Sequence, residues 1–482
     1  MKIRPQKLLS LLLAGLLLFS ATACAAGGDD PKETKDPSAT DAVTEEDTGY
    51  KPDIEVKNYD CEFVITGAQP IAGWSVAGDG AAGDPLRDAI YERGVRIKDH
   101  LGVELVLAES GGEYDYDNVV IRTVQAGDDE YQLVTTACHL GVNTLISSGA
   151  MYDFAELDSI DLDAPYWALS LMEEYTVNDK YLIGYNDFCL ANASCIVFCK
   201  DLADEYLLKY PYEDVRNMKW TMDAMLSFAS NVAKDNGDSV WDEKDIYGIV
   251  GVGFSDLVPF TTGCGIKMAD KDEDGIYHVA YNDNPERTLT MLEKVSAMRR
   301  AEYAYFWVPF TDRMDKIVPF EDGKALMKLT TTTGFTGLRG SSIRFGVLPY
   351  PMFDELQGEY MSLSWNGLLM VPGSIKQTDM VGDVIEMLAY YTAPVKVAFY
   401  EDLLGSKLAD APEDAEMLDV IWESQSNDVC LVTAEDGNRV WVDLLYLVPN
   451  LCTDGIEQYS SYLKSRTKGA NKIIEALFNP SR

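Results

Sequence analysis

The chain has 482 residues, of which 47% are hydrophobic and 11% aromatic, and it carries 79 acidic against 40 basic side chains. Because that length exceeds what one hydrophobic core usually serves, we expect two lobes. The formal net charge of −39 disfavours nucleic acid, other polyanions and anionic lipid as partners, since these bind basic surfaces, and leaves neutral or cationic ligands.

The N-terminus has the three parts of an export signal. A basic start is followed by an apolar run over residues 8–19 and by small residues up to Cys24. The run is too short to span a bilayer core, which needs ~20 residues, so we expect residues 1–23 to be a cleaved signal peptide. Cys24 would then become a lipid-modified N-terminus. Ala21 stands where such lipoprotein signals usually have leucine, which leaves secretion without lipid open.

Residues 24–58 are expected to form a disordered acidic tether. They are rich in Gly, Asp, Glu, Lys, Thr, Ser and Pro, with almost no large apolar side chain before Asp53. Such a segment cannot bury enough surface to offset the entropy of ordering it. No later stretch of about 18 uninterrupted apolar residues offers a second anchor. We therefore predict a protein held by its lipid at the extracellular face of the cell membrane.

Strands and helices are expected to alternate after Glu62. The pattern predicts strands at 63–66, 103–108 and 131–135, separated by helices at 84–101 and from Val119 to Gly127. This alternation is typical of an α/β lobe with a mostly parallel sheet. Ligands in such lobes bind beyond the carboxyl ends of the strands, so the loops at 73–83 and 136–142 are candidate binding loops.

The rest of the chain continues the mixed pattern. Two apolar stretches within 181–200 predict a strand that crosses between lobes. A long helical region is expected to begin after Trp220, a packing residue, with Thr221 as its N-cap. Further predictions are a hairpin at 270–281 with its turn at Asp274 and Gly275, strands at 345–351 and 368–372, and helices at 384–404 and 456–478.

The cysteines are interpreted mainly as buried thiols. Eight follow Cys24, namely Cys61, Cys138, Cys189, Cys195, Cys199, Cys264, Cys430 and Cys452. An even number outside the cell permits disulfides. Cys195 and Cys199 cannot pair with each other, because they lie ~13 Å apart along one predicted strand, about twice the reach of a disulfide. His100, His139 and His278 provide no zinc-binding spacing, so no metal is predicted.

Three other motifs have a simpler interpretation. Residues 78–83 match GxGxxG, but they do not directly follow a strand and acidic neighbours would repel a pyrophosphate, so no nucleotide cofactor is predicted. The segment 234–245 resembles a calcium-binding loop, but Lys234 occupies the first ligand position and Ser239 replaces the glycine that the turn needs. Calcium binding is therefore not predicted at this loop. The acidic residues at 270–275 match the first half of an EF-hand calcium loop, but Tyr281 stands where that loop has its bidentate glutamate, so the segment is interpreted as a hairpin turn with solvated acids. No GxSxG or comparable catalytic motif indicates an enzyme.

Five segments in order resemble a known family. They are DAIYER at 88–93, AGDDEY at 126–131, KWTMD at 219–223, FEDGKALM at 320–327 and FGVLPYP at 345–351. The family is that of the family 1 extracellular solute-binding proteins, the lipoprotein receptors of bacterial ATP-binding-cassette (ABC) importers, especially their clostridial sugar-type branch. The resemblance implies an α/β, two-lobe periplasmic-binding-protein-like fold of class II type, with a ligand cleft between the lobes. It divides the chain into an N-terminal lobe at 59–192 and 364–410 and a C-terminal lobe at 193–363 and 411–482.

The resemblance also implies ligand-binding residues. A sugar ring stacks its apolar face on aromatic side chains, while its hydroxyls need fixed polar partners. By position, the expected cleft residues are Trp74, His139, Asn192, Thr332, Phe335, Trp365, Asn366 and Trp441. Trp365 and Asn366 are the strongest candidates, because they precede the strand that re-enters the first lobe. For Trp441, within the apolar run 440–448, a core position and a cleft position are equally supported.

These observations lead to one prediction and two alternatives. We expect a monomeric, non-enzymatic receptor that captures an oligosaccharide and delivers it to the permease subunits of an ABC importer. The first alternative is a binding protein for a peptide or another small solute, including a sensor without a permease. The second is a secreted glycan hydrolase. Such enzymes use two carboxyl groups at a defined separation, and the sequence does not show how far apart its many acidic side chains lie.

Overall fold

The computed structural model describes residues 50–67, 85–108, 115–189, 192–307, 318–338, 341–365, 367–404, 412–434 and 438–478. The expected signal peptide, Cys24 and residues 24–49 of the expected tether lie outside these ranges, as do Trp74 and Asn366. The tether prediction was wrong for residues 50–58, because the Lys57 amide donates to the carbonyl of His100 over 2.9 Å and the Lys57 ammonium pairs with Asp383 over 2.6 Å. Within the described ranges, every helix is too short or too polar to cross a membrane.

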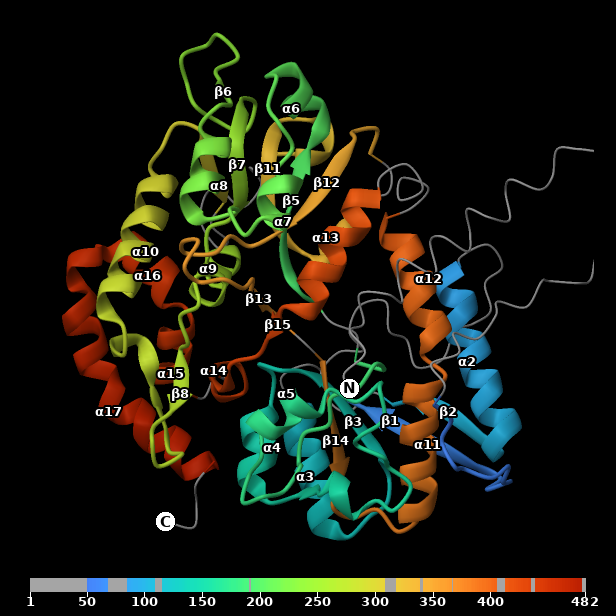
Figure 1. Cartoon of the computed structure of the whole chain (residues 1–482). Helices are drawn as coiled ribbons and strands as arrows, with labels where there is room; N and C mark the ends of the chain where they lie inside the picture. Colours follow the sequence, from blue (N-terminus) through green and yellow to red (C-terminus); the bar gives the residue numbers. More distant parts are fainter. Residues whose placement is uncertain are drawn as a thin grey trace, which may run out of the picture. The chain divides into compact units, whose positions relative to one another are not determined.

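A five-stranded sheet organises the first part of the fold, with strand order β2-β1-β3-β14-β4. Its members are β1 (Cys61–Thr66), β2 (Val103–Leu107), β3 (Leu133–Ala137), β4 (Met151–Tyr152) and β14 (Gly367–Pro372). β1 is parallel to β2 and β3, whereas β14 runs antiparallel to β3. Around this sheet lie α2 (Pro85–Leu101), α3 (Tyr116–Ala126), α4 (Val142–Ser148), α5 (Leu169–Glu174), α11 (Thr378–Tyr390) and α12 (Ala393–Leu404), as Figure 1 shows.

Hydrophobic spacing explains why α2 and α3 form where they do. Leu86, Ile90 and Ile97 of α2 are buried at intervals that place them on one helical face. α3 ends at Gly127, whose φ of 73° lies in the left-handed region that glycine adopts without strain. The predicted alternation of strand and helix in this lobe is confirmed.

A second, mixed sheet has strand order β10-β7-β11-β5-β12, with β6 paired to β7. Its members are β5 (Ser194–Cys199), β6 (Ala233–Lys234), β7 (Ile246–Val252), β10 (Ala304–Trp307), β11 (Ala325–Thr331) and β12 (Phe345–Pro349). β10 and β11 are parallel to β7, and β5 runs antiparallel to β11 and β12. Every residue of β5 is buried, which accounts for its unbroken apolar run.

Short elements and the C-terminal helices complete the fold. They are α6 (Lys200–Glu205), α7 (Tyr212–Arg216), α8 (Met222–Ala229), α9 (Pro259–Gly263), α10 (Pro285–Arg299), α13 (Pro412–Glu423), α14 (Val429–Thr433), α15 (Arg439–Leu445), α16 (Leu447–Asp454) and α17 (Tyr459–Phe478). β8 (Ala269–Lys271) and β9 (Tyr277–Val279) form the predicted hairpin, with Gly275 at φ 76° in its turn.

Two segments that run side by side connect the sheets. Residues 192–194 lead into β5 and residues 362–365 lead toward β14, and we call them the crossing segments. Ala193 and Ser364 form an antiparallel bridge between them. Next to this bridge, β13 (Ser362–Leu363) pairs in parallel with β15 (Gln425–Ser426), and Figure 1 shows both strands between the two sheets.

Three predicted elements were wrong in extent. The helix after Trp220 is short, because α8 ends at Ala229 and the Asn231 amide donates to the carbonyl of Ser227 over 2.7 Å. The helix predicted at 384–404 is two helices, α11 and α12. Pro394 explains the break, since proline has no N–H with which to continue a helix. Within 181–200, only Ser194–Cys199 forms a regular strand.

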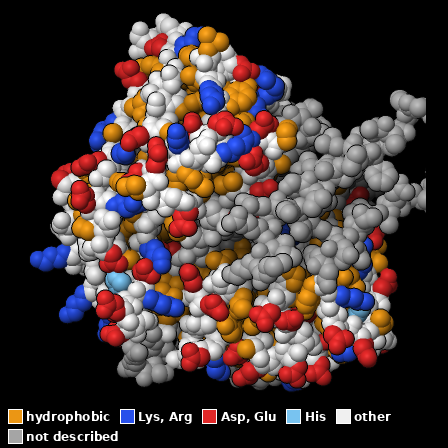
Figure 2. All heavy atoms as spheres, viewed as in Figure 1, with side chains coloured by type: hydrophobic (Ala, Val, Ile, Leu, Met, Phe, Trp, Pro, Cys, Tyr) orange, Lys and Arg blue, Asp and Glu red, His pale blue; other side chains and the backbone are white. Residues whose placement is uncertain are grey.

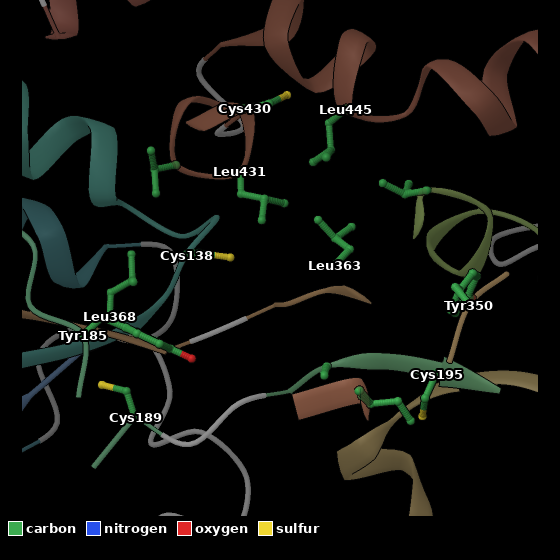
Figure 3. Packing of buried hydrophobic residues seen from close by; sticks show 14 of the residues in the cluster. Cys138, Tyr185, Cys189, Cys195, Tyr350, Leu363, Leu368, Cys430, Leu431 and Leu445 are labelled. Carbon is green, nitrogen blue, oxygen red and sulfur yellow. The ribbon is translucent and has the colours of Figure 1, made fainter. Parts of the chain in front are cut away.

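The predicted packing roles of Trp220 and the cysteines are confirmed. Trp220 is buried, and its indole N–H donates to the carbonyl of Pro349 over 3.0 Å. None of the eight cysteines of the described residues forms a disulfide, and six of them are buried. Figure 3 shows part of this interior, where Cys138, Leu363, Leu431 and Leu445 come from four different elements. The apolar core is therefore continuous beside the crossing segments.

Candidate ligand-binding site

The carboxyl ends of the parallel strands in both sheets point toward the crossing segments. In the first sheet, β3 ends at Ala137 opposite Gly367, the first residue of antiparallel β14. In the second sheet, β11 ends at Thr331 opposite Ser194, the first residue of antiparallel β5. Because β5 and β14 are the strands that the crossing segments enter, the loops after β3 and β11 lie next to these segments. This is where α/β proteins place their ligands.

Asn192 joins three of the chain's segments at this point. Its carbonyl accepts from the amide of Trp365 over 3.0 Å, and its side-chain Oδ1 accepts from the Thr333 hydroxyl over 2.7 Å. Thr333 also lies 3.2 Å from the Thr331 hydroxyl. A ring of hydroxyl and amide groups is therefore fixed at the end of β11, which suits recognition of a ligand's hydroxyls.

His139 and Trp365 meet on the first-sheet side. Their ring centroids are 5.7 Å apart, and the ring planes cross at 87°, an edge-to-face arrangement. Both side chains are only partly buried. The loop after β3 and the segment before β14 thus bring one imidazole and one indole together next to Asn192. Four of the expected site residues, His139, Asn192, Thr332 and Trp365, lie in or beside this contact network.

Thr332 and Phe335 support the site from within the protein. Thr332 is buried, its amide donates to the carbonyl of Ala193, and its Oγ1 accepts from the amide of Ala193. Phe335 is fully buried, with its ring centroid 6.3 Å from that of Phe345. These two side chains position the crossing segment and the end of β11 and are not open to a ligand in this arrangement.

Trp441 lies in the core, which removes it from the expected cleft residues. The apolar run 440–448 covers most of α15 and the start of α16, and Trp441 is 0% exposed on the inner face of α15. Its indole N–H donates to the carbonyl of Ala470 in α17 over 3.1 Å. Of the two interpretations that the sequence left open, the structure supports the core position, because an amphipathic helix turns its largest apolar side chain inward.

Sequence analysis missed an aromatic pair, Phe254 and Tyr446. Phe254 follows the carboxyl end of β7 and is 38% exposed, an unusual exposure for a phenylalanine. Its ring stacks on Tyr446, with centroids 3.9 Å apart and planes inclined by 19°. Tyr446 lies in the turn between α15 and α16, and no periodic pattern in the sequence indicated its contact with Phe254.

Asp256 holds the turn that carries Phe254. Its Oδ2 accepts from the amide of Val252 over 2.7 Å, and its Oδ1 accepts from the Ser255 hydroxyl over 3.3 Å. Burial raises the pKa of the Asp256 carboxyl to about 6, although these hydrogen bonds favour the charged form. The carboxylate therefore shapes the loop after β7 and does not project from it.

The charge distribution over the face of the molecule seen in Figure 2 is mixed. Figure 2 shows acidic and basic side chains interspersed over the face in view, so the excess of acid does not form one patch there. Among the described residues, no three His, Cys, Asp or Glu side chains are grouped so as to hold a metal ion. The groups that the structure gathers at the crossing segments are aromatic rings, hydroxyls and amides, which bind by stacking and hydrogen bonding.

Known proteins resemble this chain in three-dimensional fold and not in sequence. No protein-family model matches the sequence, and no curated protein is similar to it in sequence. Solved structures do match over most of their length. An ABC substrate-binding protein from Listeria monocytogenes, in complex with cycloalternan, is 13% identical with a TM-score of 0.53 over 83% of this chain and 99% of that one.

Two further structures match similarly. A sugar transporter from Rhizobium etli in an open conformation is 17% identical, with a TM-score of 0.56 over 85% of this chain and 98% of that one. The GacH receptor of Streptomyces glaucescens, studied unliganded and with acarbose, is 12% identical, with a TM-score of 0.54 over 88% and 100%. The fold is therefore the two-lobe, periplasmic-binding-protein-like fold of ABC solute-binding proteins.

Proposed function

We propose that this chain is an extracellular solute-binding protein that captures an oligosaccharide between its two lobes for an ABC importer. The observation that carries the proposal is the contact network of Asn192, Trp365, Thr333 and His139, which joins both lobes at the carboxyl ends of their strands. Aromatic rings and fixed hydroxyl and amide groups match the apolar faces and hydroxyls of a sugar. The sugar complexes of proteins with this fold support the same ligand class.

The proposed mechanism is closure about the crossing segments. Residues 192–194 and 362–365 are the two connections at which the sheets exchange strands, so rotation of one lobe against the other would bend there. A ligand that contacts Trp365 on one side and the β11 end on the other bridges both lobes only when they are close together. Binding would then shift the population toward the closed state.

The proposed site comprises Trp74, His139, Asn192, Thr332, Phe335, Trp365 and Asn366, together with Phe254 and Tyr446. Trp74 and Asn366 remain part of the proposal on sequence grounds. Trp365 and Phe254 are expected to contact the sugar, and Thr332 and Phe335 to hold the crossing segment in place.

The cellular setting is proposed from the sequence. Cys24 would carry the lipid, residues 24–49 would act as the tether, and residues 1–23 would be removed. The lobes would divide at 59–192 with 364–410 and at 193–363 with 411–482. The protein would act as a monomer without a cofactor, would catalyse no reaction, and would deliver its ligand to membrane permease subunits.

Thermal melts test the proposal directly. The chain from Lys51 onward would be melted with a panel of mono- and oligosaccharides, with peptides and calcium as controls. A ligand at about 100 times its dissociation constant stabilises a protein by ~2.7 kcal/mol, which raises the melting temperature measurably. A shift confined to particular glycans is expected. A shift with peptides alone, or turnover of a labelled glycan, would contradict the proposal.

A further inference from the structure

A cavity lies beside the crossing segment 362–365, whose Ser364 contacts the lining residue Gln425. It has a volume of about 350 Å³, within the range of small-molecule sites. Among its lining residues are Tyr166, Trp167, Asn186, Asp187, Lys396 and Trp422. Tyr166 and Trp167 are held on the first-sheet side by hydrogen bonds to Glu386 of α11, whereas α13, which carries Trp422, packs on β12 of the second sheet. Both halves of the fold therefore contribute walls.

This cavity and the candidate site lie on opposite sides of one crossing segment. The Ser364 hydroxyl donates to Oε1 of Gln425, a lining residue of the cavity, over 3.0 Å. The neighbouring Trp365 directs its ring toward His139. Successive side chains of an extended segment point to opposite faces. The cavity is thus separate from the network around Asn192.

Asn186, a lining residue of the cavity, has an unsatisfied hydrogen-bond donor. The residue is 3% exposed, and its Oδ1 accepts from the amide of Phe188 over 3.0 Å. Its Nδ2 has no hydrogen-bond partner within the described part of the chain. A buried amide donor without an acceptor destabilises the folded state. An occupant with an acceptor oxygen would relieve this cost.

The other polar groups favour a neutral occupant. Lys396 forms an ion pair with Asp187 over 2.9 Å, which cancels both charges at the wall. The Lys396 ammonium also lies 5.6 Å from the ring centroid of Trp422. Glu423 is exposed at the same cavity and opposes an anion. Hydroxyl groups can donate to the carboxylates and accept from Lys396 and Asn186 without adding charge.

We propose that this cavity is a second binding site, distinct from the oligosaccharide site, for a small neutral polyhydroxy compound of monosaccharide or polyol size. The Asn186 amide donates to one ligand oxygen, and the Asp187–Lys396 pair binds the neighbouring hydroxyls. Trp422 provides the apolar surface. The site requires no metal and does not depend on the proposed function.

A variant that fills the cavity tests the proposal. Ser170 is exposed on α5 and lines the cavity, so Ser170→Trp introduces an indole at its mouth without replacing a buried residue. Ser227→Trp on α8 is the matched control, because Ser227 is also exposed and lies outside the lining. Binding of D-glucose, D-xylose and ribitol to the full chain would be measured by ligand-observed NMR and calorimetry. At least one probe is expected to bind, about tenfold or more weakly to S170W and equally to S227W.

A second variant removes the Asn186 hydrogen-bond donor without filling the cavity. Asn186→Asp retains the Oδ1 acceptor for Phe188 and removes the amide donor, so it is expected to weaken the probe about tenfold while the circular dichroism spectrum is retained. The proposal is overturned if none of the three probes binds, or if S170W binds them as the unmodified chain does. Probe binding that is lost in W365A alone would assign the sugar to the candidate site and would overturn only this second site.

Discussion

Phe254 and Tyr446 stack face to face at 3.9 Å, although one follows a strand of the second sheet and the other lies between two C-terminal helices. The contact joins the loop after β7 to the junction of α15 and α16. It presents a partly exposed aromatic surface at the carboxyl end of the second sheet, where a ligand is expected. The pair thus links the C-terminal helices to the proposed site.

Replacing Phe254 with alanine is expected to weaken oligosaccharide binding about tenfold, because stacking on an aromatic ring contributes ~1 kcal/mol beyond area burial. Isothermal titration calorimetry with the glycan identified by thermal melts would measure the change. Leu356→Ala is the control, since Leu356 is 94% exposed and lies in a different loop. Equal affinity in F254A and L356A would remove Phe254 from the site.

The two tryptophans selected from sequence are expected to behave oppositely. Trp441→Ala leaves a large cavity in the core and should cost about 3–5 kcal/mol of unfolding free energy, with normal ligand affinity in the molecules that remain folded. Trp365→Ala should lower affinity and change the melting temperature little. Chemical denaturation would measure the stability of both variants, and calorimetry would measure their affinity for the ligand. If W365A melts several degrees lower and binds normally, Trp365 is a core residue.

A buried ion pair fixes α13 to the second sheet. Lys200 and Asp414 approach to 2.7 Å with side chains only 12% and 8% exposed, and Asp414 also accepts from the amide of Val347. Asp414→Asn should destabilise the protein by about 3–5 kcal/mol, because it leaves the Lys200 ammonium buried without its counter-charge.

Glu416→Gln on the same helix is the matched control for this pair. Glu416 pairs with Arg216, but both side chains are substantially exposed, so its loss should cost under about 1 kcal/mol. Urea denaturation would compare the two variants. A similar loss of unfolding free energy in D414N and E416Q would contradict the assigned role of burial.

The stability of the fold is expected to fall as the pH rises from about 4 to 6. Burial, followed by the nearby charges of Glu423 and Glu416, raises the pKa of the Asp419 carboxyl to about 6. In the unfolded chain this pKa is about 3.9. Between these values the folded state holds a proton that the unfolded state has released, so each increase in pH favours unfolding.

Asp419→Asn removes the contribution of Asp419 to this effect and should raise the melting temperature at pH 7.5, with no gain below pH 4, whereas the buried Asp256 carboxyl, whose pKa is also about 6, continues to contribute. Melts across the pH range would show the difference. Asp99→Asn is the control, because Asp99 is exposed on α2. A pH-independent difference between D419N and the unmodified chain would contradict the assigned cause.

The fold is expected not to depend on disulfides. All eight cysteines of the described residues are thiols, and only Cys61 and Cys452 are partly exposed. Dithiothreitol should therefore leave the melting temperature unchanged, and a thiol reagent should label these two positions first under native conditions. Mass spectrometry of labelled peptides would identify them. Rapid labelling of Cys195 in the centre of β5 would contradict the described core.

Much of the fold could be predicted from sequence because its signals are local. The spacing of Leu86, Ile90 and Ile97 predicts α2, and Thr221 accepts from the amide of Ala224 as the predicted N-cap. The turn at Gly275 needs only a residue that tolerates positive φ. Helix length was predicted less well. The apolar pattern continues past the end of α8 and across the break before α12, so it does not show where either helix ends.

The candidate site could be predicted only in part. His139, Asn192 and Trp365 follow or precede predicted strands, and topology alone places such residues at the carboxyl ends of the sheets. Trp441 could not be assigned, because an apolar run does not show which side of a helix faces the core. Phe254 and Tyr446 were missed, since the contact depends on how two distant elements pack.

The sequence by itself determined the alternation of strands and helices, the acidic surface chemistry and the candidate crossing residues, because these depend on neighbours along the chain. The tertiary structure alone decided that Trp441 is buried, that Phe254 meets Tyr446 and that Ser364 contacts Gln425 while Trp365 contacts His139. Burial and the facing of side chains arise from packing between residues that are remote in sequence, and no local pattern records them.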